Sequence, residues 1–241
     1  MTSNQSDFGQ PIGYAVPGWT ARQVPSRQAM QGRLCRVEPL DADRHGDDLF
    51  AANSLDQTGA GWTYMSMDAF ADMAQYRDWV SAVAAQDDPL YHAIIESRSG
   101  KAVGVAAYMR INPEHGVIEV GSIRYSPLLQ RQPAATEAIY LMLARVFDEL
   151  GYRRCEWKCD ALNEPSRKAA LRLGFTFEGI FRQAVVYKGR NRDTAWYSII
   201  DSDWPALKQA YQQWLAAENF TDDGRQKQHL GAFIETARQL V

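Results

Sequence analysis

The strongest constraint on the fold is a change of hydrophobic period near the middle of the chain. Three β-prone runs, 91–97, 102–111 and 116–126, are separated by the turn sequences RSGK and NPEHG. This pattern predicts a three-stranded antiparallel meander. Over 132–151 the apolar residues recur instead at helical spacing, and Gly151 follows as a natural stop. Strands followed by such a helix predict a mixed α/β (α+β) domain with helices against a central sheet.

The remaining elements extend this order on both sides. We expect a strand at 33–40 and helices near 45–52 and 67–85 before the meander. After it come a strand at 153–162, a helix at 163–174, a hairpin around Gly189 and a closing helix at 203–215. The predicted organisation is an arm (1–30), a domain (31–201), a docking helix (202–217) and a polar, weakly periodic tail (218–241).

Composition and charge narrow the classes of partner. The 241 residues are 46% hydrophobic, enough for one full core, and the formal net charge is −3. Such a charge gives no general attraction to nucleic acid or to an anionic membrane, so neither partner is expected. No basic start precedes an apolar run, and no apolar run reaches the length of a membrane span. We therefore expect a cytoplasmic protein.

Cysteine usage favours packed thiols over disulfides or metal. Only Cys35, Cys155 and Cys159 are present, an odd number that makes a poor disulfide framework. Cys155 and Cys159 stand four residues apart in a predicted strand and the histidines are scattered, so a zinc site is a minor alternative. No metal is expected.

Two separated motifs carry a family resemblance. The segment QRQPAATEA places Gln130, Pro133 and Ala135 at spacings 0, 3 and 5, and the segment from Asn163 contains Ser166, LGF and EG in order. These residues resemble the GCN5-related N-acetyltransferases (GNAT family), and within them the RimJ/RimL type, over roughly residues 33–200. The resemblance implies the GNAT fold, acetyl-CoA as cosubstrate and transfer of an acetyl group to an amine.

The first motif also has a physical reading of its own. A turn that opens a helix leaves backbone N–H groups without partners, and these attract an anion such as a pyrophosphate. The family has glycine where this chain has Pro133, which removes one donor but suits the first helical position. The alternative is that Pro133 starts a structural helix to which nothing binds. The groups expected to remain are the amides of Ala134, Ala135 and Thr136, with Arg131 nearby.

The resemblance further implies two groups of residues around the acetyl thioester. A lip on the strand before the helix would offer backbone N–H groups to the acetyl carbonyl, and Gly121 is consistent with a β-bulge there. Asn163 and Ser166 would reach the pantetheine arm and the departing thiolate, with Ser166 as proton donor, although both residue types also cap helices. The residues of the lip are Ser122, Ile123, Arg124 and Tyr125.

The acceptor side is less determined by the sequence. An α-amino group has a pKa about 2.5 units below that of lysine, worth roughly 3.4 kcal/mol, so a weak or water-relayed base suffices. Glu119 is the candidate base, because it precedes the lip and matches an often acidic RimL position; an ordinary exposed strand glutamate is the alternative. Candidate acceptor-binding residues are Trp62, Tyr64, Asp193 and Tyr197. Trp62 and Tyr64 could equally belong to the hydrophobic core.

Three functions stay open at this stage. The first is an acetyl-CoA-dependent N-acetyltransferase acting on a primary, α-type amine of a protein N-terminus or a small molecule. The second is acetylation of aminoacyl nucleotides or other toxic amines as a resistance function, and the third is a non-catalytic CoA-binding module. A homodimer is an open option, since many relatives pair.

Overall fold

A single mixed sheet organises the molecule. The computed structural model describes residues 4–239, and its eight-stranded sheet has the order β3-β4-β5-β6-β7-β8-β10-β9. Only the β7–β8 pair is parallel among the described strands, while the other pairs are antiparallel. The strands are β3 (Met30–Gln31), β4 (Cys35–Pro39), β5 (Leu90–Glu96), β6 (Ala102–Asn112), β7 (Val117–Tyr125), β8 (Arg154–Asp160), β9 (Thr176–Tyr187) and β10 (Arg190–Ile200).

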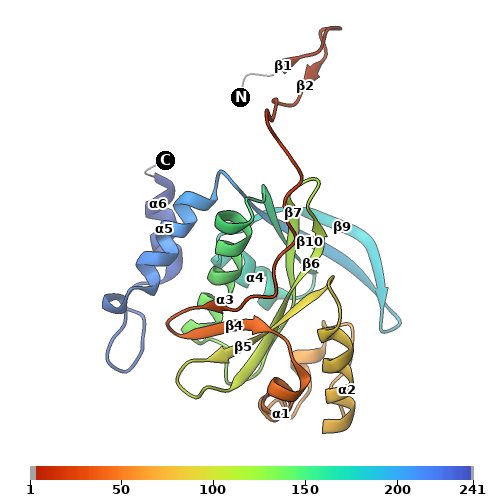
Figure 1. Cartoon of the computed structure of the whole chain (residues 1–241), viewed down its shortest axis with the longest axis vertical. Helices are drawn as coiled ribbons and strands as arrows, with labels where there is room; N and C mark the ends of the chain where they lie inside the picture. Colours follow the sequence, from red (N-terminus) through yellow and green to blue (C-terminus); the bar gives the residue numbers. More distant parts are fainter. Residues whose placement is uncertain (1–3, 240–241) are drawn as a thin grey trace.

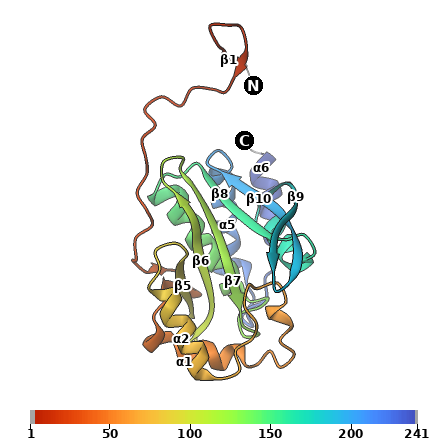
Figure 2. The ribbon, with the colours of Figure 1, turned by 90° about the vertical axis from the view of Figure 1, so that its right-hand side faces the viewer.

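Helices cover the two faces of the sheet in separate layers (Figures 1 and 2). Alternate residues of β6 face opposite layers: Val105 and Ala107 lie in the core shared with α1 and α2, and Ala106 and Tyr108 in the core shared with α3 and α5. No helix within residues 4–239 has the length and apolar character needed to cross a membrane. The helices are α1 (Ala42–Asn53), α2 (Met73–Ala84), α3 (Pro133–Ala144), α4 (Glu164–Arg172), α5 (Trp204–Leu215) and α6 (Leu230–Gln239).

The predicted meander and the strand–helix alternation after it are confirmed, but the start of one helix is not. We expected a helix from residue 67, whereas α2 begins at Met73, after Asp72, whose side chain accepts a hydrogen bond from the backbone N–H of Gln75. Phe70 lies in the preceding loop and makes edge contacts with Trp62 and Tyr76. The helical spacing of the apolar residues before Met73 therefore belongs to a loop that packs on the core.

Part of the amino-terminal arm, around residues 19–23, is docked on the domain, whereas its first residues project away from it. Trp19 donates its indole N–H to the carbonyl of Glu114 at 2.8 Å, and Tyr152 donates its hydroxyl to the carbonyl of Gln23 at 3.0 Å. Beyond this docked part, the small hairpin of β1 (Asn4–Gln5) and β2 (Pro11–Ile12) projects away from the body (Figure 1).

The carboxyl-terminal segment is more ordered than the sequence indicates. We expected a weakly periodic tail, but α6 buries Leu230, Ile234 and Ala237 in the main core. Arg238 adds a hydrogen bond to the carbonyl of Gly174 at 2.9 Å. Phe233 of the same helix is half-buried and also packs against this core.

His92 gives the fold a testable dependence on pH. The ring is fully buried in β5, Nδ1 donates to the Leu90 carbonyl at 3.1 Å, and Nε2 has no partner in residues 4–239. Burial, with a smaller contribution from the nearby charge of Arg145, lowers the pKa of His92 to about 4. Between this value and about 6.5 the unfolded chain binds the extra proton, so stability rises with pH in this window.

We predict that the native protein loses about 3 kcal/mol of unfolding free energy on this account between pH 7 and pH 4. The variant His92→Phe keeps the ring but cannot titrate, so its stability should fall less over the same range. Urea unfolding at several pH values measures this difference, with the exposed His115→Phe as matched control. Equal pH slopes for His92→Phe and the native protein would contradict the assignment.

Candidate active site

The site is built around a wedge where β7 and β8 separate. The two strands pair only from Val117 to Glu119 on β7 and from Arg154 to Glu156 on β8, although each continues beyond that point. In the described chain, the later parts of these strands have no pairing with each other. Helices α3 and α4 begin after β7 and β8, so both helix N-termini lie at the wide end of the wedge. An extended ligand could pair with the free strand edges.

A bulge interrupts β7 at the lip. Val105 of β6 pairs with Arg124, but Ala107 pairs with Gly121, so β7 carries one residue more than its partner. The extra residue is accommodated at Ser122, whose φ of 48° is left-handed. Such a conformation costs a non-glycine residue about 1–2 kcal/mol and turns backbone groups out of the ladder. The bulge expected near Gly121 is therefore present.

The loop before α3 has unused donors. Gln132 is the N-cap residue and Pro133 occupies the first turn, as predicted. The N–H of Ala135, which we expected to be free, donates to the Gln132 carbonyl at 3.1 Å because the first turn is tight. Among residues 4–239, no hydrogen bond is formed by the N–H groups of Arg131 and Ala134.

Positive charge gathers at the same turn. Arg172 of α4 donates through Nη1 to the hydroxyl of Thr136 at 3.1 Å, and Arg131 lies in the loop itself. No acidic residue lies in the first turn of α3. A cation near a helix N-terminus is unfavourable unless an anion accompanies it. Gln130 stabilises the loop by donating its side-chain amide to the Tyr125 carbonyl at 3.0 Å. The donor set therefore fits a pyrophosphate.

Asn163 and Ser166 lie on the other side of the wedge. The side chain of Asn163 caps α4 by accepting from the backbone N–H of Ser166 at 3.2 Å. The Ser166 hydroxyl accepts from the indole N–H of Trp157 at 3.0 Å, and it also forms a hydrogen bond with the thiol of Cys159. Capping is confirmed, and it is compatible with the predicted role towards the thiolate, which stays a prediction.

Glu119 is buried rather than exposed, so the alternative of an ordinary surface glutamate is wrong. Its Oε2 atom lies 2.5 Å from Nη1 of Arg110 and 3.0 Å from Nζ of Lys158. Its Oε1 atom is turned along the strand, because a Cβ added at Gly121 would lie 3.0 Å from it. One carboxylate oxygen is thus held by two cations, and the other faces the bulge.

Beyond Lys158 the charges continue across the sheet. Lys158 also forms an ion pair with Glu156 at 2.6 Å. Glu156 in turn pairs with Arg154 at 2.8 Å. Arg154 donates from Nη1 and Nη2 to the two carboxylate oxygens of Glu178. The hydrogen bonds from Arg154, opposed by partial burial, hold the pKa of Glu178 below its usual value. Glu178 therefore completes a structural row of ion pairs that starts at Arg110.

The α1–α2 loop, residues 54–72, is tied to the lip strand by a buried cation. Arg124 lies 3.1 Å from the Asp56 carboxylate, and its guanidinium stacks 4.7 Å from the Trp62 ring. Burial alone would raise the pKa of Asp56, but hydrogen bonds from Gly61 and Thr58 and the charge of Arg124 together lower it. The side chain of Arg124 therefore positions the loop, and only its backbone belongs to the lip.

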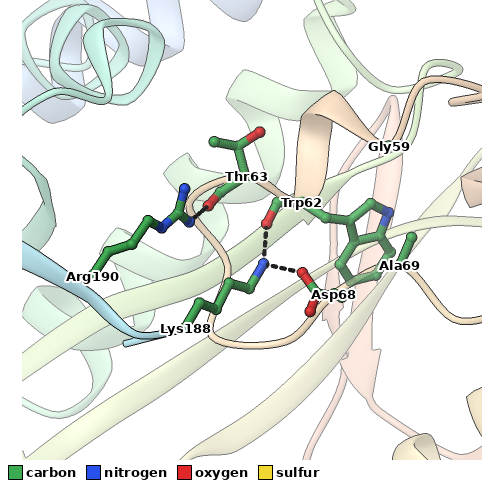
Figure 3. A pocket seen from close by; sticks show the side chains of 7 residues that line it. All are labelled: Gly59, Trp62, Thr63, Asp68, Ala69, Lys188 and Arg190. Carbon is green, nitrogen blue, oxygen red and sulfur yellow. Dashed lines mark hydrogen bonds and ion pairs between the residues drawn. The ribbon is translucent and has the colours of Figure 1, made fainter. Parts of the chain in front are cut away.

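The α1–α2 loop is also held by hydrogen bonds from the β9–β10 hairpin, and a cavity of about 660 Å³ lies beside these contacts (Figure 3). Lys188, in the turn between β9 and β10, donates to the Trp62 carbonyl at 2.9 Å, and Arg190, the first residue of β10, donates to the Thr63 carbonyl at 3.0 Å. Tyr64 donates its hydroxyl to the Leu162 carbonyl, at 3.0 Å, in the loop before α4. The cavity is lined by Gly59, Trp62, Thr63, Asp68, Ala69, Lys188 and Arg190.

Two of the predicted acceptor residues lie apart from this cavity. The Asp193 carboxylate accepts from the Gln183 N–H at 2.7 Å and from Asn191, within an irregular part of the hairpin. Tyr197 is buried in the core beside α4, where its hydroxyl accepts from Arg167 at 3.2 Å. Their role in acceptor binding stays a prediction.

The sequence missed Lys188 and Arg190, although both flank the recognised turn glycine Gly189. No sequence pattern shows which segment the tip of a hairpin faces.

The cysteines are buried thiols, as predicted, and burial raises the pKa of Cys155 and Cys159. Within residues 4–239 there is no cluster of three or more His, Cys, Asp or Glu suited to a metal ion.

Comparison with known proteins agrees with this geometry. The family description "Acetyltransferase (GNAT) domain" matches residues 36–176. A crystal structure of a GCN5-related N-acetyltransferase from Brucella melitensis is 53% identical, with a TM-score of 0.90, and covers 91% of this chain and 100% of that one. The uncharacterized N-acetyltransferase p20 of Bacillus licheniformis is 27% identical over 148 residues, 58% of this chain and 80% of p20.

A third comparison concerns the fold alone. A structure described as the microcin C7 self immunity acetyltransferase MccE in complex with acetyl-CoA and AMP is 20% identical, with a TM-score of 0.62. It covers 70% of this chain and 93% of its own. From the matched family and the close Brucella structure, the chain belongs to the GNAT family and is an acetyl-CoA-dependent N-acetyltransferase.

We predict that Asp56→Asn loosens the α1–α2 loop. Removing the carboxylate charge leaves the guanidinium of Arg124 buried without its ion pair, which should cost about 3 kcal/mol of unfolding free energy. Chymotrypsin should also cleave faster after Trp62 or Tyr64. Limited proteolysis and urea unfolding measure the two effects. The exposed pair of Asp47 and Arg77 supplies the control, Asp47→Asn, expected to change stability by less than about 1 kcal/mol. Unchanged proteolysis of Asp56→Asn would show that the ion pair does not hold the loop.

Proposed function

We propose that the protein transfers the acetyl group of acetyl-CoA directly to a primary α-type amine of a protein N-terminus or a small molecule. The observation that carries this proposal is the wedge between β7 and β8, which adjoins the bulge of β7. A cavity lies on the α1–α2 loop, and one of its lining residues, Trp62, contacts Arg124 of β7. We assign the thioester to the wedge and the acceptor to the cavity.

Binding of the cosubstrate would use the groups at the wide end of the wedge. The free N–H groups of Arg131 and Ala134, with the guanidinium groups of Arg131 and Arg172, suit the pyrophosphate. The cosubstrate supplies an activated acetyl thioester. Backbone N–H groups of the lip, Ser122 to Tyr125, would stabilise negative charge that develops on the acetyl oxygen.

The two proton transfers would use one residue near the attacking amine and one near the departing thiolate. Oε1 of Glu119 faces the bulge and would take a proton from the amine, directly or through water. The hydroxyl of Ser166 would donate a proton to the departing thiolate, while the indole N–H of Trp157 stays hydrogen-bonded to its oxygen. An α-amine is partly neutral near pH 7.5, so this modest help is sufficient.

A second candidate is acetylation of aminoacyl nucleotides. It is supported by the shared fold with MccE, whose structure holds acetyl-CoA and AMP. Stacking of a base on Trp62 is disfavoured, however, because this indole is only 5% exposed and contacts Arg124 and Phe70. The RimJ/RimL subtype, a cytoplasmic location and a homodimer remain part of the proposal.

A panel of amines tests the function. Radiolabelled acetyl-CoA is incubated with peptides that have a free N-terminus, with the same peptides N-terminally blocked but containing lysine, and with aminoacyl adenylate analogues. We expect label on the free N-terminal peptides and none on the blocked ones. Label only on lysine would contradict an α-amine acceptor, and label on no amine would contradict the proposed transfer to these acceptors.

We further predict that Glu119→Gln lowers kcat/KM about 100-fold at pH 7.5, because the base is lost while the side chain keeps its size. The affinity for acetyl-CoA should stay unchanged. Glu178→Gln is the matched control, since it weakens the far end of the same row of ion pairs. Unchanged turnover in Glu119→Gln, or an equal loss in both variants, would remove the assignment of Glu119 as base.

A further inference from the structure

The acceptor cavity is unusually basic for this chain. Its lining contains two cationic side chains, Lys188 and Arg190, and one carboxylate, Asp68. Lys188 lies in the turn between β9 and β10 and Arg190 begins β10, and both side chains point towards the α1–α2 loop (Figure 3). The whole chain, by contrast, has a formal net charge of −3. The local excess of positive charge therefore needs an explanation of its own.

Arg190 has most of its donors unused. A guanidinium offers five N–H donors in a planar fork that suits carboxylate and phosphate groups. Its recorded hydrogen bond runs from Nη2 to the Thr63 carbonyl, and the Tyr187 ring lies 5.3 Å from its central carbon. No carboxylate in residues 4–239 forms an ion pair with Arg190. The fork is thus available to an anion that enters the cavity.

Lys188 has a partner that a ligand can replace. Its Nζ atom lies 2.7 Å from the Asp68 carboxylate, but the Asp68 side chain is 87% exposed while that of Lys188 is 15% exposed. An ion pair with one partner in water contributes little to stability. An anionic group of the acceptor could therefore take the place of Asp68, and Lys188 would keep its bond to the Trp62 carbonyl.

The rest of the hairpin adds to the positive field. Arg182 and Arg192 also lack an acidic partner within 4 Å in the described chain. The nearest acid in sequence, Asp193, accepts hydrogen bonds from Gln183 and Asn191 instead. A cleft bordered by one sign of charge raises the local concentration of ligands of the opposite sign.

We propose that this cavity is a subsite for a negatively charged group, a carboxylate or a phosphate, carried by the acceptor close to its reactive amine. Arg190 binds the anion through its free fork, and Lys188 pairs with it in place of Asp68. The inference rests on the proposed function, because it names the acceptor class of the same site. The opposite arrangement, in which Asp68 binds a cationic acceptor, is disfavoured because two cations face the single exposed carboxylate.

Acceptors that differ in one charge test the proposal. Three peptides beginning Ser-Glu, Ser-Gln and Ser-Lys, otherwise identical, are compared by kcat/KM and by equilibrium binding in the presence of CoA. We expect Ser-Glu to exceed Ser-Gln by about tenfold, with Ser-Lys lowest, and the ratio to shrink at high salt. A peptide with phosphoserine at position two, and an aminoacyl nucleoside with and without its phosphate link, show whether carboxylate or phosphate is preferred.

Two variants assign the effect to the cavity. In Arg190→Gln the ratio of Ser-Glu to Ser-Gln should fall to about one, while affinity for acetyl-CoA is unchanged. Arg182→Gln removes a cation of the same hairpin outside the cavity lining, so it should lower the ratio much less than Arg190→Gln does. Equal use of the three peptides, a preference for Ser-Lys, or an unchanged ratio in Arg190→Gln would overturn the subsite but leave the transfer reaction intact. Arg190-dependent binding of Ser-Glu without acetylation would support the subsite and contradict the proposed function.

Discussion

The partial pairing of β7 with β8 is the constraint on which the rest of the structure depends. Two parallel neighbours that stay together would satisfy each other's backbone groups and leave no space between them. Here the pairing ends at Glu119 and Glu156, so both strands present free edges just before α3 and α4 begin. The bulge at Ser122 turns β7 at the same level. The wedge is thus a consequence of backbone geometry before any side chain is considered.

Charged side chains fix the elements around this wedge. The row of ion pairs from Arg110 to Glu178 joins side chains of β6, β7, β8 and β9. It fixes the carboxylate of Glu119 next to the bulge in β7. Arg124 and Asp56 fasten the α1–α2 loop to the strand that carries the lip. Breaking one partner of a buried pair leaves an unpaired charge, which costs several kcal/mol, so these pairs define one arrangement. Residues of this loop, with Lys188 and Arg190, then line the cavity in which we propose that the acceptor binds.

The sequence predicts the elements better than the contacts between them. Period and turn residues are local signals, so the meander, α3, α4 and the hairpin at Gly189 followed from them. The start of α2 did not, because Phe70 has helical spacing but packs from a loop. The pairing of Ala135 with Gln132 was also unpredictable, since it depends on how tightly one turn is wound. Local patterns do not reveal long-range contacts.

The same limit applies to the site. Ser166, Asn163 and the Pro133 turn stand in recognisable motifs, and their neighbours could be expected on chemical grounds. Arg172 and Arg190 reach the site from distant segments, so only the folded chain shows that they face Thr136 and Thr63. Glu119 was an expected base, but its pairing with Arg110 and Lys158 depends on strand register, which a single sequence does not fix.

Calorimetric titration with acetyl-CoA tests the central claim most directly, with CoA, dephospho-CoA and ATP as comparison ligands. The wedge and the donors of Arg131, Ala134 and Arg172 predict saturable binding of acetyl-CoA and CoA, and none of ATP at the same concentrations. No binding of acetyl-CoA would show that Pro133 closes the turn to pyrophosphate and would contradict the account of the cosubstrate site.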